Sequence, residues 1–590
     1  MKLREGGDKM AVDVLSIDGG LKLLPEMVLL TGILALFFIT NLGDAKIRIP
    51  LTRLRIPALL GGNRFKWNAD PRIPGIVSVF TLIFAIGMLI QTLGDDCANV
   101  MQGFCSETTI LTTSGNNPVH LLKLDSFSRL FELMFFLTLL LVSAASINRL
   151  QADSNPSTDD LDQLLDNRRQ VDFYLLLLIS GLGMTIVAMS MNLFVLFVGL
   201  ELASLPIYVM VAFHKESKAG SEAGVKYFIT GAISSAVGLY GMSLLYLWSG
   251  SLQLTVLEAA WSAMSTPEAL PLFGISLLLV GFGFKISAVP FHFVAPDAYA
   301  GASSPVAALL ATASKALGFI GLMRILMIIT LPDTGDTAVW MFAFGILSVV
   351  TMTWGNLAAL GSENPKRMLA YSSVAHAGYM MSALVAVAAW KNGSYAETNN
   401  EGLMAAELII GAILFHLFVL ISFKIGAFMV LSHLETEEEV TDMSSLHGLA
   451  KREPLIATSM FVFMLALAGV PPLAGFMSKF LMVTGIIQVA SADALTNNNV
   501  DLIPTFFGMH WTFFLAISIF VNSAISLYYY LRIGVLMFFE ESKTRLPLPK
   551  VSVLRLTIFV CALGTIFFGI NSDWLIESVT NAAAALFSNS

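Results

Sequence analysis

Ionisable side chains recur inside apolar segments between residues 190 and 490 of this 590-residue sequence. A charged residue at the middle of a membrane helix costs about 2.5–3.5 kcal/mol on insertion scales, so a series of such residues indicates a function. Seven residues share this setting: Glu201, Lys226, Lys285, Lys315, His376, Lys424 and Lys479. Their positions predict a row of titratable groups that faces the interior of a helix bundle.

Lysine and histidine in such a row are suited to proton transfer. Burial favours the neutral form of a lysine, whereas a nearby carboxylate favours the charged form. A change in hydration or in a neighbouring charge then makes the group release or accept a proton near neutral pH. We therefore predict a proton relay in which Glu201 sets the charge state of the nearest lysine.

Prolines are expected to break two of the helices that carry these lysines. Pro290 lies five residues after Lys285, and the Pro471-Pro472 pair precedes Lys479. Each proline removes an intrahelical hydrogen bond, and the freed backbone is tolerated at membrane depth only where protein or water satisfies it. Paired broken helices are typical of transporters built from inverted repeats.

Some of these residues also fit a structural role. Lys226, Lys424 and Lys479 lie near enough to helix ends to reach the membrane surface or to terminate a span. His376 fits a hydrogen-bonded core position as well as a relay position. His292, beside the expected break, either lines a water-filled opening on the cytoplasmic side or caps freed backbone groups.

The composition defines the elements that must position these side chains. The sequence is 56% hydrophobic and only 13% charged, whereas an ordinary soluble domain has about 25% charged residues. Apolar runs of about 20 residues are long enough to span a bilayer. They predict an all-α membrane protein of about fourteen helices near residues 23–42, 73–94, 127–148, 171–190, 192–213, 223–249, 271–290, 305–330, 338–361, 366–390, 404–433, 455–488, 506–535 and 553–583. The turn between the fourth and fifth helices is expected at Met191-Asn192.

Basic residues concentrate in alternate loops, beginning with seven lysines and arginines between residues 46 and 72. By the positive-inside rule these loops are cytoplasmic and both termini are periplasmic. We predict a multi-pass protein of the bacterial inner membrane. Arg324, near the end of its span, is expected to contact lipid head groups.

The sequence gives little support for binding of a metal, a cofactor or nucleic acid. Cys97, Cys105 and Cys561 lack metal-ligand spacing, and neither a Gly-rich dinucleotide signature nor a cluster-binding cysteine set is present. No basic patch argues for nucleic acid. We therefore expect neither a cofactor nor a metal in this chain. Cys97 and Cys105 form either a disulfide or two free thiols.

Five segments carry a resemblance to a known family: FVGLELASLPIYVM, EAGVKYFITGAISSA, GFGFKISAVPFHFVAPDAYAGASSPVAALLATASKALGF, GNLAALGSENPKRMLAYSSVAHAGYMM and GVPPLAGFMSKF. In order and spacing, roughly residues 20 to 580 resemble subunit N, or subunit 2, of the proton-pumping NADH-quinone oxidoreductase, respiratory complex I. The block at 281–319 is the most specific part.

The resemblance implies an antiporter-like fold with two inverted five-helix repeats and broken helices 7 and 12. It divides the chain into an N-terminal three-helix segment with long loops (1–150), a first repeat (151–335), a second repeat (336–540) and a C-terminal helix (541–590).

The resemblance also implies roles for individual residues. Glu201 would be the carboxylate of the fifth helix and Lys285 its partner on the broken seventh. Lys315 would connect the two halves, Lys479 would lie near the outlet, and Lys226 matches a further lysine of the sixth helix. NADH, flavin, iron-sulfur clusters and quinone would bind partner subunits, and the chain would contact neighbouring membrane-arm subunits and lipid.

Three positions depart from the family pattern. Val294 replaces a common tryptophan and Ser304 a common proline, but neither change removes an ionisable group. Lys424 stands at a usually neutral position and leaves the proton route through the second half open.

A cation/proton antiporter of the Mrp type is the alternative function, because it uses the same side-chain chemistry. The ELASLPIY and PDAYAGASSPV strings favour the complex I subunit. A membrane scaffold does not explain two helix breaks beside lysines.

Overall fold

The computed structural model describes residues 22–41, 46–48, 55–57, 72–94, 108–112, 120–147, 160–214, 216–264, 266, 268–329, 336–392, 400–437, 440–491, 510–542, 548 and 551–587. Within these ranges twelve helical segments are long and apolar enough to cross a membrane. The predicted class, an all-α multi-pass membrane protein, is confirmed; the number of fourteen crossings stays a prediction. Cys97 and Cys105 lie outside the described residues.

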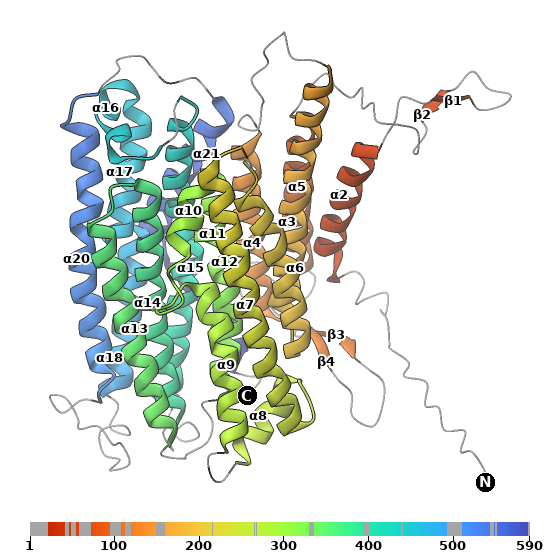
Figure 1. Ribbon diagram of the computed structural model, residues 1–590. Coiled ribbons are helices and arrows are strands. Elements are labelled where there is room, and N and C mark those ends of the chain that lie inside the picture. Colours follow the sequence, from red (N-terminus) through yellow and green to blue (C-terminus); the bar gives the residue numbers. More distant parts are fainter. Residues whose placement is uncertain are drawn as a thin grey trace, which may run out of the picture.

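The N-terminal part contributes three helices at one side of the bundle (Figure 1). They are α2 (Leu24–Asn41), α3 (Ile73–Gly94) and α4 (Ser126–Ser146). Two antiparallel strand pairs accompany them: β1 (Lys46–Arg48) with β2 (Arg55–Pro57), and β3 (Thr108–Thr112) with β4 (His120–Leu124). Asp125 accepts a hydrogen bond from the Ser128 amide and so fixes the start of α4 directly after β4.

The next part forms the middle of the bundle (Figure 1). Its helices are α5 (Asp160–Met189), α6 (Leu193–Val211), α7 (Lys218–Ser249), α8 (Leu254–Ser262), α9 (Ala269–Ile286), α10 (Ala295–Gly301), α11 (Ser304–Ala311) and α12 (Ala313–Ile329). The predicted turn at Met191-Asn192 is confirmed, because α5 ends at Met189 and the Asn192 side chain caps α6 through the Phe194 amide. Gly183 lets α5 and α6 approach closely, since a Cβ there would collide with the Ala203 amide.

Most of the last part lies on the opposite side of the bundle from α2 (Figure 1). Its elements are α13 (Asp336–Leu360), α14 (Pro365–Asn392), α15 (Asn400–Leu434), the 3-10 turn η1 (Met443–Leu446), α16 (Leu449–Arg452), α17 (Pro454–Ala468), α18 (Ala474–Ser491), α20 (Phe513–Phe538), α21 (Ser552–Ile570) and α22 (Asp573–Phe587). Of these, α15 and α21 lie in the middle of the bundle and contact α4 (Figure 1).

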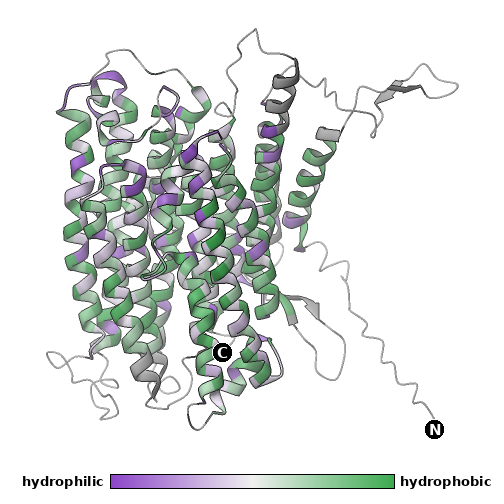
Figure 2. Ribbon diagram, in the orientation of Figure 1, coloured by the Kyte–Doolittle hydropathy of each residue, from purple (hydrophilic) through white to green (hydrophobic). Residues whose placement is uncertain are grey.

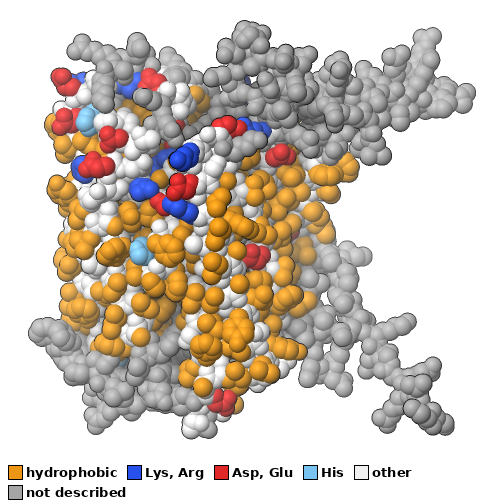
Figure 3. Space-filling model, viewed as in Figure 1, with side chains coloured by type: hydrophobic (Ala, Val, Ile, Leu, Met, Phe, Trp, Pro, Cys, Tyr) orange, Lys and Arg blue, Asp and Glu red, His pale blue; other side chains and the backbone are white. Residues whose placement is uncertain are grey.

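Four helices of the bundle, α11, α12, α14 and α15, are enclosed by the others. Nearly every residue is buried in α15 from Ala405 to Leu434, in α14 from 368 to 388, and in α11–α12 from Ser304 to Ile325. The remaining helices carry hydrophobic residues along most of their lengths (Figure 2), and hydrophobic side chains cover most of the described surface on one face (Figure 3). A polar side chain on α12 or α15 is therefore removed from both water and lipid.

The predicted helix breaks at the prolines are present. α9 ends at Ile286, one residue after Lys285, and Pro290 lies in the non-helical linker that follows. Pro471 and Pro472 lie in the linker between α17 and α18.

Two spans predicted as single helices are interrupted in ways that the sequence analysis missed. The chain breaks at Thr312, between α11 and α12, because its backbone angles leave the helical range. The final span, 553–583, is also two helices, α21 and α22.

Candidate functional site

Glu201 and Lys285 lie on neighbouring helices but do not form a direct ion pair. Glu201, on α6, accepts a 2.5 Å hydrogen bond from the Ser235 hydroxyl of α7. Lys285, at the end of α9, is buried and donates to the Ser204 hydroxyl at 2.7 Å. Ser204 lies three residues after Glu201 on the same helix, so the carboxylate and the ammonium group approach the same face of α6. The predicted pair of Glu201 and Lys285 is therefore indirect: Lys285 contacts Ser204 on α6, the helix that carries Glu201.

Lys315 satisfies the backbone that the first break exposes. Its side chain on α12 is 2% exposed, and its ammonium group donates to the Ile286 carbonyl at 2.8 Å. Ile286 is the last residue of α9, so its carbonyl has no backbone N–H donor within the helix. The lysine thus ties α12 to the broken end of the helix that carries Lys285.

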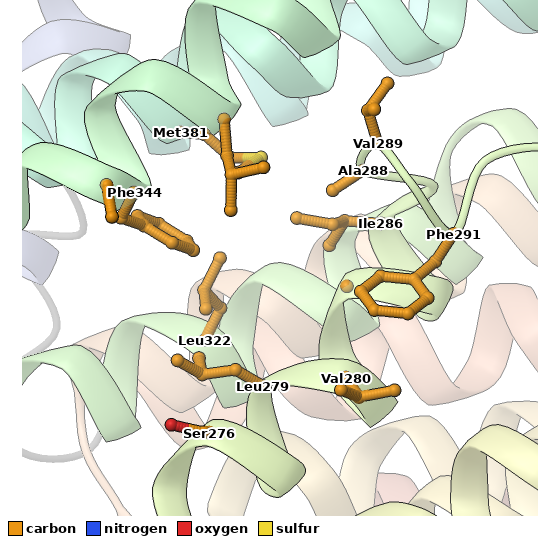
Figure 4. Close-up of a pocket in the computed structure, with 13 residues that line it drawn as sticks. Ser276, Leu279, Val280, Ile286, Ala288, Val289, Phe291, Leu322, Phe344 and Met381 are labelled. Carbon is orange, nitrogen blue, oxygen red and sulfur yellow. The ribbon is translucent and has the colours of Figure 1, made fainter. Parts of the chain in front are cut away.

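An apolar pocket lies on the other side of the same break (Figure 4). Ile286, Phe291, Leu322, Phe344 and Met381 project into it, and apart from the Ser276 hydroxyl its lining side chains are apolar. A buried water needs two to four polar partners. This pocket therefore suits an apolar group and does not provide the water-filled opening expected beside Pro290.

The second half contains a continuous series of hydrogen-bonded side chains. Lys424 on α15 donates to the Ser372 hydroxyl of α14 at 2.6 Å. Ser372 shares a 2.5 Å hydrogen bond with the Tyr530 hydroxyl of α20, which lies 3.3 Å from His376 Nε2. Two predicted site residues, Lys424 and His376, are thereby connected through a serine and a tyrosine.

The series continues beyond His376 to α18. His376 Nδ1 lies 2.9 Å from His416 Nε2, and the two rings stack with centroids 5.0 Å apart. His416 Nδ1 lies 2.8 Å from the Ser478 hydroxyl. All members have at most 2% relative exposure. We call these six side chains the polar chain: Lys424, Ser372, Tyr530, His376, His416 and Ser478.

Lys479 follows the last member of the polar chain and occupies the second break. Its ammonium group donates to the Leu467 and Ala468 carbonyls at 3.0 and 3.2 Å, where α17 ends. It also lies 5.3 Å from the centre of the Tyr379 ring, a favourable position for a cation. Lys315 and Lys479 thus bind backbone carbonyls at the two helix breaks in the same manner.

Lys226 departs from the expected interior position. Its side chain is 47% exposed and pairs with Glu222 at 2.7 Å and with Asp297 at 3.0 Å. Asp297 also accepts from Arg367 at 2.6 Å. Lys226 therefore lies on an outer face of α7 and not at the interior position predicted for the seven ionisable residues.

Two further side chains differ in environment. Arg324 is buried and donates to the backbone carbonyls of Ala188 and Ser190, so the expectation that it contacts head groups is wrong. It satisfies carbonyls left free where α5 ends. His292 is half-buried and packs edge-on against Trp354.

The polar chain can be given one consistent direction of donation. The lysine ammonium is only a donor, so Ser372 accepts from it and donates to Tyr530, which donates to His376 Nε2. His376 Nδ1–H then donates to His416 Nε2, and His416 Nδ1–H donates to Ser478. Both histidines are assigned the Nδ1–H tautomer by this network. Every member between the two ends accepts one hydrogen bond and donates one, which is the arrangement that proton transfer along the series requires.

The sequence did not predict four members of the polar chain: Ser372, Tyr530, His416 and Ser478. His416 lies eight residues before Lys424 in the same apolar run, a spacing that places both on one helix face. Ser372 likewise lies four residues before His376. The tyrosine on α20 has no comparable signal, because only the tertiary packing brings α20 to α14.

Among the described residues no group of three or more His, Cys, Asp or Glu side chains is arranged to hold a metal ion. The fold and the site define a polytopic membrane protein whose buried basic residues are placed at two helix breaks. A family model described as "NADH:quinone oxidoreductase/Mrp antiporter, TM" matches residues 190–497. The chain belongs to this family of membrane subunits, as the sequence resemblance predicted.

Individual relatives extend this similarity over most of the chain. NADH-quinone oxidoreductase subunit N of Desulfitobacterium hafniense is 34% identical over 465 residues, which cover 78% of this chain and 85% of the relative. F(420)H(2) dehydrogenase subunit N of Methanosarcina mazei is 34% identical and covers 87% and 93%. A chain of respiratory complex I from Thermus thermophilus with bound Aureothin matches with a TM-score of 0.65 at 26% identity, covering 94% and 98%. A chain of the Mrp complex from Dietzia sp. has a TM-score of 0.72 at 18% identity, and shows a shared fold.

Proposed function

We propose that this chain translocates protons as the subunit N of an NADH-quinone oxidoreductase, with the polar chain as the route through its second half. The observation that carries the proposal is the unbroken series of hydrogen bonds from Lys424 to Ser478, whose buried members lie on α14, α15, α18 and α20. A purely structural role does not need six consecutive polar groups at the centre of a membrane bundle, where each costs free energy unless it is satisfied.

The mechanism begins in the first half. A change in charge near Glu201 alters its electrostatic attraction for Lys285, which is otherwise held by one hydroxyl. Movement of a proton from Lys285 toward Lys315 places charge next to the second half. Lys315 and Lys479 both lie within electrostatic reach of Lys424, so a charge arriving at Lys315 favours release of a proton from Lys424.

The second half then transfers this proton by exchange. Lys424 gives a proton to Ser372 while Ser372 passes its own to Tyr530, and the shift continues through His376 and His416 to Ser478. The members from Ser372 to Ser478 are neutral before and after the shift, so the charge resides only on the lysines at the two ends of the route. At the outlet end Ser478 would give up its own hydroxyl proton to Lys479, the next residue, whose amine must be neutral to accept it and can still donate to the Leu467 and Ala468 carbonyls.

Partner subunits would carry the redox chemistry. NADH, flavin, iron-sulfur clusters and quinone belong to them in this proposal, and this chain would contribute no redox centre. Neighbouring antiporter-like subunits would contact the outer face that bears Lys226, whose salt bridges with Glu222 and Asp297 favour an interface position over an interior one. The protein would reside in the bacterial inner membrane with both termini periplasmic and with two inverted repeats, 151–335 and 336–540.

Purification in a mild detergent tests the proposal against the Mrp-type alternative. Copurification of flavin and iron-sulfur absorbance with this chain is expected. Isolation with only other antiporter-like chains would contradict it and favour cation antiport. The relatives favour the first outcome, because subunits N are about 34% identical to this chain, whereas the Mrp similarity rests on the fold.

A further inference from the structure

A second group of buried ionisable side chains lies in the N-terminal part, away from the polar chain. Glu26, in the first turn of α2, is 8% exposed, and Glu132, in the second turn of α4, is 0% exposed. Arg129, one turn before Glu132, donates to Glu132 Oε2 at 2.8 Å and to the Lys22 carbonyl at 2.6 Å. One guanidinium group therefore joins α4 to the start of α2.

Three carboxyl oxygens of this group have no hydrogen-bond partner. Both oxygens of Glu26 and Oε1 of Glu132 are buried and unsatisfied. The two carboxyl groups lie close enough to hydrogen-bond with each other once one of them carries a proton. An unprotonated carboxylate can only accept, so two of them cannot satisfy one another. One proton bound between the two carboxyl groups would give two of these unsatisfied oxygens a hydrogen bond.

The balance of charges around Glu26 and Glu132 also favours one bound proton. With both carboxylates ionised, Glu26 and Glu132 carry two negative charges against the single positive charge of Arg129. Asp125, which caps α4, adds a further negative charge, which acts on both Arg129 and Arg324. The facing helix α3 and the segment of α5 from 173 to 189 have no charged residue. An uncompensated charge in such a site is costly, and one bound proton removes it.

We propose that Glu26 and Glu132 form a carboxyl pair that binds one proton, held in place by Arg129. The protonated carboxyl donates to the other carboxylate, and the remaining negative charge is paired with the guanidinium group. An apolar site can keep a carboxylic acid neutral at pH 7, and two carboxyl groups in close contact do not readily both ionise. The site is separate from the relay, so its failure leaves the proposed function standing.

Infrared spectroscopy of the purified complex tests the pair directly, since a protonated carboxyl group has a carbonyl stretch that a carboxylate lacks. We expect a band that Glu26→Gln and Glu132→Gln each remove. The control Glu216→Gln, at an exposed residue paired with Arg169, should leave the band unchanged. A band that persists in either pair variant would overturn the proposal.

A second set of variants keeps the test decisive if the glutamine variants fail to assemble. Glu26→Asp and Glu132→Asp retain an acid but change its distance from the partner carboxyl. Each should shift the frequency of the band, because the shared hydrogen bond changes in length. An unchanged frequency in both aspartate variants would show that the band arises elsewhere and would refute the pair.

Discussion

Replacing His416 by Phe interrupts the polar chain at its least replaceable member. The substitution removes the 2.9 Å contact with His376 Nδ1 and the 2.8 Å contact with Ser478. The phenyl ring can keep the stacking on His376 but is larger than the imidazole, so a packing cost of about 1–3 kcal/mol is expected at this buried position. Ser478 retains the Gly475 carbonyl as a partner. His376 Nδ1–H is therefore the one group left unsatisfied.

The unsatisfied donor costs about 1–3 kcal/mol of stability. The effect on transfer comes from the lost imidazole, because no other group of the polar chain accepts from His376 and donates to Ser478. A positioned proton-transfer group contributes about 10²- to 10⁴-fold to a rate, so the rate of proton transfer should fall by about that factor. Electron transfer in partner subunits does not involve His416. We therefore expect the ratio of protons pumped to electrons transferred to fall steeply in vesicles that contain the reconstituted complex.

A matched control lies on the same helix. His433 is also buried in α15, but both of its ring nitrogens lack hydrogen-bond partners. His433→Phe should therefore keep the full pumping ratio. Normal pumping by His416→Phe, or an equal loss in both variants, would refute the assignment of the polar chain as a proton route.

Further predictions concern stability. Arg324→Met removes a charged donor from the Ala188 and Ser190 carbonyls and should destabilise the complex by about 1.5–3 kcal/mol, seen as a lower melting temperature in detergent; an unchanged melting temperature would contradict the bonding described. Gly475→Ala places a Cβ against the Ala466 carbonyl at the second helix break and should cost about 1–3 kcal/mol in thermal unfolding. Gly87→Ala, where a Cβ meets open space, should be neutral or stabilise by up to about 1 kcal/mol. Equal effects of the two glycine changes would show that the break is not tightly packed.

The class of fold could be predicted from the sequence because membrane burial requires long apolar runs, and these are visible in one dimension. The breaks at Pro290 and Pro471-Pro472 were predictable for the same reason, since proline has a fixed local effect. The interruption at Thr312 was not, because threonine is compatible with a helix and only the packing around it selects another backbone conformation. The inverted-repeat relation between the two halves stays a prediction.

The site was predictable to the extent that charge is costly in a membrane. That cost identified Lys285, Lys315, Lys424 and Lys479, all of which are buried. It placed Lys226 inside as well, although tertiary packing exposes one face of α7. Hydroxyl groups carry no such cost signal, so Ser372 and Tyr530 could not be distinguished from ordinary packing residues. Their role follows only from the contacts between helices far apart in the sequence.

Proton pumping by a Lys285→Ala variant tests the central claim most directly. The reconstituted complex should still transfer electrons, because Lys285 contacts the Ser204 hydroxyl and no redox group is expected in this chain. If the chain translocates protons through the buried basic residues, the number of protons pumped per electron falls in the variant relative to the wild type. A wild-type ratio of protons to electrons in Lys285→Ala would contradict the account.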